Sequence, residues 1–270
     1  MKNSSINASK KDMRVTRARL LNPFWKVFYW YISSLDRDGE VIFLNYGYAD
    51  DKKLELKKED ENNRYSIQLY NHIVASIGLE GLDILEVGCG RGGGTFYIAR
   101  YFAPKSVMGM DLCEKSIDFC RKHYSVKGLS FCYGNALNLP YMDNNLDAVV
   151  NVESSHRYSN MERFLREVYR VLKPGGYFLF ADLRDKESIE SLRGQLNNSR
   201  LKIIKEEIIT PNVIKALVLD NERRIDLIKK LVPKFLHRLI KEFAGTKETA
   251  LYESFVTRKK EYLHYVLRKV

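Results

Sequence analysis

A glycine-rich stretch flanked by acidic residues carries the clearest chemical signal in this 270-residue chain. Gly88, Gly90 and Gly93 follow the spacing G-x-G-x-x-G, and Asp111 stands beyond them at the distance usual for a ribose-binding acid. Glycines let a backbone approach a ligand closely, and an acid after the second strand accepts hydrogen bonds from ribose hydroxyls. The spacing therefore predicts a site for a dinucleotide or for S-adenosylmethionine.

Glu86 favours the second of these two cofactors. It stands two residues before Gly88, which places a carboxylate at the end of a predicted strand. That negative charge suits the sulfonium and ammonium groups of S-adenosylmethionine and opposes a pyrophosphate. We therefore predict S-adenosylmethionine as the cofactor and S-adenosylhomocysteine as its product, and we rank an NAD-dependent dehydrogenase last among the alternatives.

His156 is the predicted general base. Methyl transfer depends mostly on aligning the acceptor oxygen with the methyl carbon, but a saturated alcohol must also lose its proton as the new bond forms. Of the five histidines, only His156 lies just past a predicted central strand (146–152), where a parallel sheet opens its ligand crevice. A histidine that merely packs or hydrogen-bonds in a loop is the alternative.

Two carboxylates near His156 complete the predicted acceptor site. Asp182, at the end of a predicted strand, is expected either to orient His156 or to cap the helix that follows. Glu153 is expected to line the methyl site or to hydrogen-bond the cofactor. Further upstream, Tyr46 and Tyr48 offer aromatic faces that attract a sulfonium, although ordinary core packing accounts for two tyrosines equally well.

The sequence predicts no metal site. The other histidines have no acid or cysteine at ligand spacing and are expected to be structural or on the surface: His72, His123, His237 and His264. The cysteines contain no C-x-x-C pair, so neither a zinc finger nor a disulfide framework is indicated: Cys89, Cys113, Cys120 and Cys132. This usage is typical of a reducing cytoplasm.

An alternating α/β framework must hold these residues. Apolar strands are predicted at 83–87, 106–110, 129–133, 146–152 and 177–182, with amphipathic helices at 64–77, 113–124, 160–172 and from the glycine loop to 102. A helix at 186–198, a strand at 201–209 and a closing strand at 261–268 follow. Strands that alternate with helices form a parallel sheet covered on both faces.

An amphipathic stretch interrupts this alternation before the last strand. Residues 213–243 are predicted to be helical and broken at Pro233, with an apolar face made of Ile225, Ile228, Val232, Phe235, Leu239 and Phe243. The expected organisation is an N-terminal helical, basic and aromatic arm and cap (1–63), a cofactor-binding core (64–210 plus 260–270) and a helical lid insertion (211–259). The lid and the aromatic residues Phe24, Trp25, Phe28, Trp30 and Tyr31 are expected to enclose an apolar acceptor.

Five motifs in order resemble the class I S-adenosylmethionine-dependent methyltransferases. They are residues 85–92 (LEVGCGRG), Asp111, Asn135-Ala136, 146–149 (LDAV) and 171–176 (VLKPGG). The resemblance implies a Rossmann-like sheet of seven strands whose last strand runs antiparallel. It also implies that Glu86, Gly88 and Gly90 face the methionine part of the cofactor. Asp111 would then bind the ribose, Leu112 and Ala136 would flank the adenine, and Asn135 would lie near its amino edge.

The flanking segments are similar to the phthiotriol/phenolphthiotriol dimycocerosates methyltransferase family. They are residues 45–48 (NYGY), 64–70 (RYSIQLY), 151–158 (NVESSHRY), 181–184 (ADLR), 231–235 (LVPKF) and 250–253 (ALYE). This likeness adds Asn151 to the expected cofactor-binding residues. It implies an O-methyltransferase that acts on a hydroxyl of an apolar small molecule, a lipid or a polyketide-like acceptor.

The net charge of +11 is concentrated at two places. Residues 1–20 and 222–241 each carry +5, whereas residues 21–221 carry −1. A neutral middle argues against nucleic acid as a partner and favours peripheral contact with something acidic. The basic face of residues 222–241 is compatible with docking on an anionic membrane, and a solvated helix face with i, i+4 ion pairs is the alternative. No apolar run is long enough for a bilayer span, so a cytoplasmic, membrane-peripheral enzyme is expected. An RNA methyltransferase and a non-catalytic S-adenosylmethionine-binding protein remain the alternatives.

Overall fold

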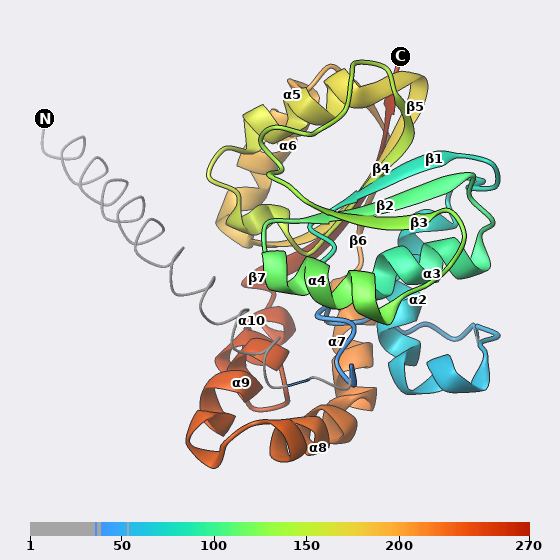
Figure 1. Cartoon of the computed structure of the whole chain (residues 1–270). Coiled ribbons are helices and arrows are strands. Elements are labelled where there is room, and N and C mark those ends of the chain that lie inside the picture. The colour runs from blue at the N-terminus through green and yellow to red at the C-terminus, as the bar shows by residue number, and fades with distance from the viewer. Residues whose placement is uncertain (1–35, 37–38, 53) are drawn as a thin grey trace, which may run out of the picture.

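A seven-stranded sheet forms the centre of the computed structural model, which describes residues 36, 39–52 and 54–270 (Figure 1). Its strand order is β3-β2-β1-β4-β5-β7-β6. The strands are β1 (Asp83–Val87), β2 (Ser106–Asp111), β3 (Leu129–Tyr133), β4 (Leu146–Val152), β5 (Leu172–Asp185), β6 (Leu201–Ile208) and β7 (Lys260–Lys269). β1 to β5 run parallel to one another, and β7 runs antiparallel to both β5 and β6. The predicted Rossmann-like sheet with an antiparallel last strand is confirmed.

Helices cover both faces of this sheet. They are α2 (Arg64–Val74), α3 (Gly93–Tyr101), α4 (Glu114–His123), α5 (Met161–Val171) and α6 (Ile189–Asn197), with short 3-10 turns η1 (Lys58–Asn63), η2 (Ser155–Arg157) and η3 (Lys186–Ser188). α2 and α3 pack on one face, and α5 and α6 pack on the other. α5 illustrates the cause: Met161, Phe164, Leu165, Val168 and Val171 are buried at helical spacing, and the Asn160 side chain accepts the Arg163 N–H at its start.

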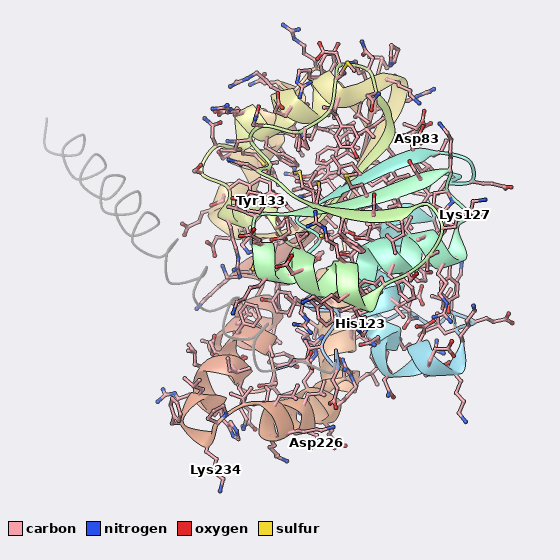
Figure 2. The ribbon with its side chains drawn as sticks, viewed as in Figure 1. Asp83, His123, Lys127, Tyr133, Asp226 and Lys234 are labelled. Carbon is pink, nitrogen blue, oxygen red and sulfur yellow. The ribbon has the colours of Figure 1, made fainter. Side chains whose placement is uncertain are left out.

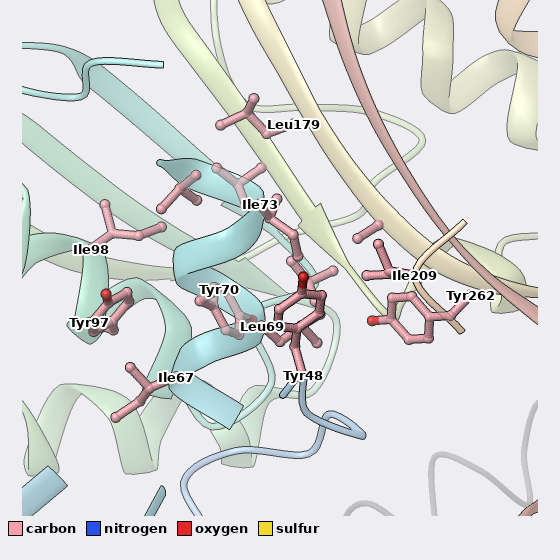
Figure 3. Close-up of a cluster of buried hydrophobic side chains, with 14 of the residues drawn as sticks. Tyr48, Ile67, Leu69, Tyr70, Ile73, Tyr97, Ile98, Leu179, Ile209 and Tyr262 are labelled. Carbon is pink, nitrogen blue, oxygen red and sulfur yellow. The ribbon is translucent and has the colours of Figure 1, made fainter. Parts of the chain in front are cut away.

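One core cluster lies between α2 and the sheet, close to the ligand end of the strands. Figure 3 shows Leu69, Tyr70 and Ile73 of α2 gathered beside Leu179 of β5 and Tyr262 of β7. Two of these residues are tyrosines whose hydroxyls bond buried carboxylates, which ties the apolar core directly to the site described below.

Four α-helices connect β6 to β7: α7 (Thr210–Leu219), α8 (Asn221–Leu231), α9 (His237–Ala244) and α10 (Ala250–Val256), with the 3-10 turn η4 (Lys234–Leu236) after α8. We call them the connecting helices. They lie beyond one end of the sheet, where Figure 2 labels Asp226 and Lys234. No helix in the described part of the chain combines the length and apolarity that a bilayer crossing needs.

The predicted apolar face of this stretch is wrong at two positions. Ile228 and Val232 are buried as expected, but Phe235 is 82% exposed and Leu239 is 41% exposed, while Ile240 is buried instead. Pro233 explains the difference. Val232 and Pro233 have extended backbones, so the helix that restarts after them has a different rotational phase.

The arm at residues 1–20 and the aromatic run with Phe24, Trp25, Phe28, Trp30 and Tyr31 lie outside the described residues. Asp36, the first described residue, is bound to the core. A buried ion pair joins Asp36 to Arg91, and the guanidinium of Arg91 stacks on Phe119 at 3.7 Å. Residues 39–48, which we call the strap, then run over the ligand end of the sheet to Tyr48, whose N–H donates to the Tyr65 carbonyl.

Candidate active site

A cavity of about 710 Å³ opens at the carboxyl ends of β1, β2 and β4. The glycine loop after β1, the turn after β2 and the loop after β4 form its walls, and strap residues 42–45 cover it. Ligands bind at this edge in open parallel sheets, where the strand order reverses. Six predicted cofactor or catalytic residues line the cavity together with Glu153: Gly88, Gly90, Asp111, Leu112, Asn135 and Ala136.

The glycine loop is shaped by two close approaches. Gly88 has a left-handed backbone (φ +81°), and a Cβ there would lie 2.3 Å from the Ser154 Oγ, so no other residue fits. Gly90 is also left-handed (φ +53°), but a Cβ there would meet only Leu44, at 3.7 Å. The loop is therefore packed tightly against the segment after β4 at Gly88 and open toward the cavity at Gly90.

Asp111 fixes this loop to the end of β2. Its Oδ2 accepts the Gly90 N–H at 2.9 Å, and its Oδ1 accepts the Cys113 N–H at 2.8 Å. Burial raises the pKa of Asp111, and these backbone N–H groups oppose that rise. Each carboxylate oxygen keeps a lone pair for further donors, as a ribose diol requires.

Two predicted cofactor contacts lie beneath the cavity wall and do not line it. Glu86 is fully buried, and its carboxylate accepts hydrogen bonds from Tyr70 (2.6 Å) and from the Thr95 hydroxyl. The Asn151 amide donates to the Val87 carbonyl at 2.8 Å. Burial raises the pKa of Glu86. Both residues thus hold the carboxyl end of β1 in place from below.

Glu153, directly after β4, is a strained residue on the cavity wall. Its φ is +49°, a conformation that costs free energy in a residue with a Cβ and that often marks a functional position. Oε1 accepts the Tyr46 N–H and the Tyr262 hydroxyl, both at 2.8 Å. Burial raises the pKa of Glu153 to about 8. Oε2 accepts no hydrogen bond from any residue that the structure describes.

His156 and Asp182 form a hydrogen-bonded pair at the ends of β4 and β5. The His156 Nδ1 lies 2.7 Å from the Asp182 Oδ1, and Asp182 also accepts the His156 N–H and the Ser155 hydroxyl. Burial alone would raise the pKa of Asp182, but the charges of His156 and Arg184 hold it well below its usual range. Asp182 contacts His156 and is not the cap of the next helix, which follows Asp185.

The side chain of His156 does not itself line the cavity. Its Nε2 accepts a hydrogen bond from the Arg157 Nε at 3.0 Å, and Arg157 does line the cavity. The guanidinium of Arg157 also lies 5.8 Å from the ring centre of Phe243 in α9. Sequence reasoning missed Arg157, although its place beside His156 was a usable signal.

The two tyrosines of the strap lie apart from the first cavity. Tyr48 stacks on His72 with 4.2 Å between ring centres, so its ring packs in the core. Tyr46 is buried beside Phe255 and lines a second cavity of about 110 Å³. Sequence reasoning did not predict that Tyr262 in β7 bonds Glu153, because β7 reaches this site only through the sheet topology.

The second cavity lies between the strap and helices α8 and α9. Its wall is mainly apolar and includes Phe43, Leu44, Leu227, Ile228, Leu231, Val232, Ile240 and Phe243. Phe43, Leu44 and Asn45 also line the first cavity, so this part of the strap separates the two. Arg224 of α8 fixes it there by donating to the Asn45 and Tyr46 carbonyls.

Two histidines predicted to be isolated meet an acid in the fold. The ligand atoms of His72, Glu207 and His264 lie within 4.8 Å of one another, across α2, β6 and β7. Sequence spacing does not reveal this group because its members come from three elements. Lys205 donates to the same Glu207 carboxylate at 2.7 Å, so the carboxylate already has cationic and histidine donors, and we treat the group as a hydrogen-bonded cluster.

Sequence comparison finds a family model described as "Methyltransferase domain" that matches residues 85–180. A fatty-acid O-methyltransferase of Mycolicibacterium smegmatis is 39% identical over 246 residues, which cover 90% of this chain and 89% of that protein. A phthiotriol/phenolphthiotriol dimycocerosates methyltransferase of Mycobacterium tuberculosis is 37% identical over 249 residues, covering 90% and 92%.

Comparison with solved structures supports the fold. The cyclopropane synthase MmaA2 from Mycobacterium tuberculosis aligns with a TM-score of 0.67 at 14% identity, and the alignment covers 88% of this chain and 98% of that one. The sheet and the helices that cover it are thus shared by proteins with little sequence in common.

Proposed function

Because this chain belongs to the class I S-adenosylmethionine-dependent methyltransferases, among relatives of the phthiotriol/phenolphthiotriol dimycocerosates methyltransferases, we propose that it O-methylates an apolar, lipid-like acceptor. The observation that carries this proposal is the pair of cavities. A polar cavity at the strand ends and an apolar cavity beneath α8 and α9 share the strap residues Phe43 to Asn45 as a common wall.

The residues of the first cavity fit S-adenosylmethionine. Gly90 leaves open space above the loop, and the Asp111 carboxylate is held ready for the two ribose hydroxyls. Leu112, Ala136 and Leu137 offer an apolar surface for the adenine ring. Glu86 and Asn151 hold the carboxyl end of β1 in place beneath the cavity wall, as described above. When bound, S-adenosylmethionine would supply a methyl group on a sulfonium: the acceptor oxygen would bond to the methyl carbon as the carbon–sulfur bond breaks and leaves the neutral thioether S-adenosylhomocysteine.

On the acceptor side, we propose the His156–Asp182 pair as the base for a hydroxyl acceptor. Asp182 bonds the Nδ1 of His156, which fixes the ring and leaves Nε2 to take a proton. Arg157 donates to Nε2 in this structure, so Arg157 has to move aside when the acceptor enters. Glu153, whose Oε2 accepts no hydrogen bond from the described residues, is placed to hydrogen-bond the acceptor hydroxyl or, once ionised, the cofactor ammonium.

The second cavity is proposed to hold the apolar tail of the acceptor. Its lining of aliphatic and aromatic side chains favours hydrocarbon, because burying such surface is worth roughly 25 cal/mol per Å². The tail would pass from the first cavity into the second past Phe43 and Leu44, which border both.

A carboxylate acceptor is a second candidate, and Arg157 is the observation that favours it. A guanidinium on the cavity wall pairs well with a carboxylate, and a relative is named a fatty-acid O-methyltransferase. A carboxylic acid is already ionised near neutral pH and needs no base, whereas an alcohol does. The two candidates therefore differ in their dependence on His156.

Methyl transfer to a long-chain secondary alcohol and to a fatty acid, measured as S-adenosylhomocysteine release, tests the proposal. We expect His156→Ala to lower kcat about 10²- to 10⁴-fold for the alcohol and to leave a fatty acid nearly unaffected. Cofactor affinity should stay unchanged, because His156 does not line the cavity. His123→Ala, in α4 and outside both cavities, is the matched control.

Three outcomes would contradict the proposal. If His156→Ala left turnover of the alcohol unchanged, the base would have to be another group. If S-adenosylmethionine bound but no apolar acceptor were methylated, the chain would be a non-catalytic binding protein. If RNA were methylated with a steep dependence on salt, the acceptor class would be wrong.

A further inference from the structure

We infer that the turn between α8 and α9 is a docking surface for an anionic lipid bilayer. This surface consists of Lys234 and Phe235 in the turn and of Arg238 and Leu239 in the first turn of α9, and we call it the basic tip. This inference goes beyond the proposed reaction, because docking requires neither cofactor nor acceptor.

The apolar part of the basic tip points away from the protein. Phe235 is 82% exposed and Leu239 is 41% exposed, although large apolar side chains are usually buried when the core offers room. Four residues apart, they stand on the same side of the chain around the start of α9. The neighbouring Ile240 and Val232 are buried. Phe235 and Leu239 are therefore the apolar residues of this segment that face away from the protein.

The charges around these two side chains select an anionic partner. Residues 229–241 contain five lysines and arginines and no aspartate or glutamate. Lys229 and Lys230 are paired with Asp226 and Glu40. Lys234 and Arg238 are exposed and form no ion pair with any residue in the described ranges. An aromatic side chain between unpaired cations is typical of proteins that lie on anionic membranes.

The place of the basic tip in the fold makes such docking possible. Figure 2 shows Lys234 at the end of the molecule away from the sheet, with its side chain directed outward. The helices on either side of the tip carry Leu231, Val232 and Ile240 on their inner surfaces, where they line the second cavity. A bilayer bound at the tip would thus lie next to the helices that enclose the proposed tail site.

Co-sedimentation with phosphatidylcholine vesicles, with and without phosphatidylglycerol, tests this inference in the absence of cofactor and acceptor. We expect the full chain to bind only vesicles that contain phosphatidylglycerol, and binding to weaken as salt is raised. Lys234→Glu with Arg238→Glu should weaken binding at least about 30-fold, since each basic residue contributes about fivefold. Phe235→Ser with Leu239→Ser should weaken it about tenfold or more.

Matched variants elsewhere on the surface control for charge and apolarity. Lys127→Glu with Lys202→Glu changes the net charge equally, and Met142→Ser removes an apolar side chain that is 81% exposed. Both should bind vesicles as the original chain does. Phe235→Trp should retain binding and be quenched by bromine-labelled lipid, whereas Met142→Trp should not be quenched.

Absence of binding to phosphatidylglycerol vesicles would overturn the inference, as would equal losses in the tip and control variants. Binding of RNA that depends on Lys234 and Arg238 but not on Phe235 would assign the charges to a nucleic acid instead. Turnover of a dispersed short-chain acceptor reports on the proposed reaction alone, so failure of docking and failure of the proposed function are distinguishable.

Discussion

At the scale of single residues, Glu153 joins the two halves of the site. Its carboxylate lies between the strap and β7 and faces the cavity, and its pKa of about 8 stands well above the ordinary value of 4.5. A raised carboxyl pKa means that the protonated form is favoured in the folded protein. The stability that Glu153 contributes to the folded protein is fully present below about pH 4.5 and is lost as the pH rises to about 8.

Glu153→Gln should therefore change the pH dependence of stability. Glutamine keeps the shape but cannot ionise, so the variant should gain stability relative to the original chain as the pH rises from 5 to 9, on the order of a few kcal/mol. Urea unfolding at a series of pH values measures this difference. A constant difference at every pH would show that Glu153 does not titrate in that range.

Gly88 allows a sharp test of the glycine loop. Gly88→Ala places a methyl group against Ser154 in a left-handed backbone, so we expect loss of S-adenosylmethionine binding and a destabilisation of about 2 kcal/mol or more. Gly194→Ala is the control: it lies inside α6 with nothing within 4 Å of a Cβ, and should stabilise the chain by up to about 1 kcal/mol. Titration calorimetry and thermal unfolding give both quantities, and normal cofactor affinity in Gly88→Ala would contradict the assignment of the loop.

Sequence reasoning found the residues of the first cavity more readily than it found their roles. The glycines and Asp111 belong to one strand–loop–helix–strand unit, from β1 to the end of β2, so local spacing was enough to place them. Glu86 and Asn151 were expected to contact the cofactor, but each bonds groups that come from other elements, such as Tyr70 in α2 and Val87 in β1. Long-range contacts of this kind leave no local pattern.

At the scale of elements, the second cavity depends on how α8 and α9 pack against the strap. Ile240 of α9 is buried and lines this cavity. Ile240→Trp fills part of it, so we expect kcat/KM for long-chain acceptors to fall about tenfold or more and that for short-chain acceptors to change little. Val256→Trp in α10, where Val256 is 44% exposed, is the control. An equal loss for all chain lengths would mean that the tail lies elsewhere.

The sheet strands show what local patterns can and cannot predict. β1, β3 and β4 begin and end at the predicted residues, because each is a short apolar run bounded by turn residues. β5 begins five residues earlier than predicted, at Leu172, because Leu172 pairs with Leu146 before the register shifts. Local patterns also could not predict that the helix after Pro233 restarts with a different rotational phase, because apolar periodicity identifies the buried face only while one helix continues.

At the scale of the whole molecule, the basic charge and the first cavity belong to different segments of the chain. The neutral region holds the cofactor cavity, and the basic segment 222–241 contains the basic tip and much of the second cavity. The absence of a basic stripe over the core disfavoured an RNA acceptor at the sequence level, and the relatives described above carry names of lipid-modifying enzymes. The +5 of residues 222–241 alone did not distinguish a solvated helix from a membrane surface; that distinction needed the exposure of Phe235.

The partition formed by Phe43, Leu44 and Asn45 has a thermodynamic consequence. A displacement that widens one compartment narrows the other, and Arg224 and Glu153 resist such displacement from opposite sides through Tyr46. We therefore expect occupancy of either compartment to alter affinity in the other, and by the same factor in both directions. The cofactor and the acceptor tail, bound as we propose, would then be coupled energetically through the strap.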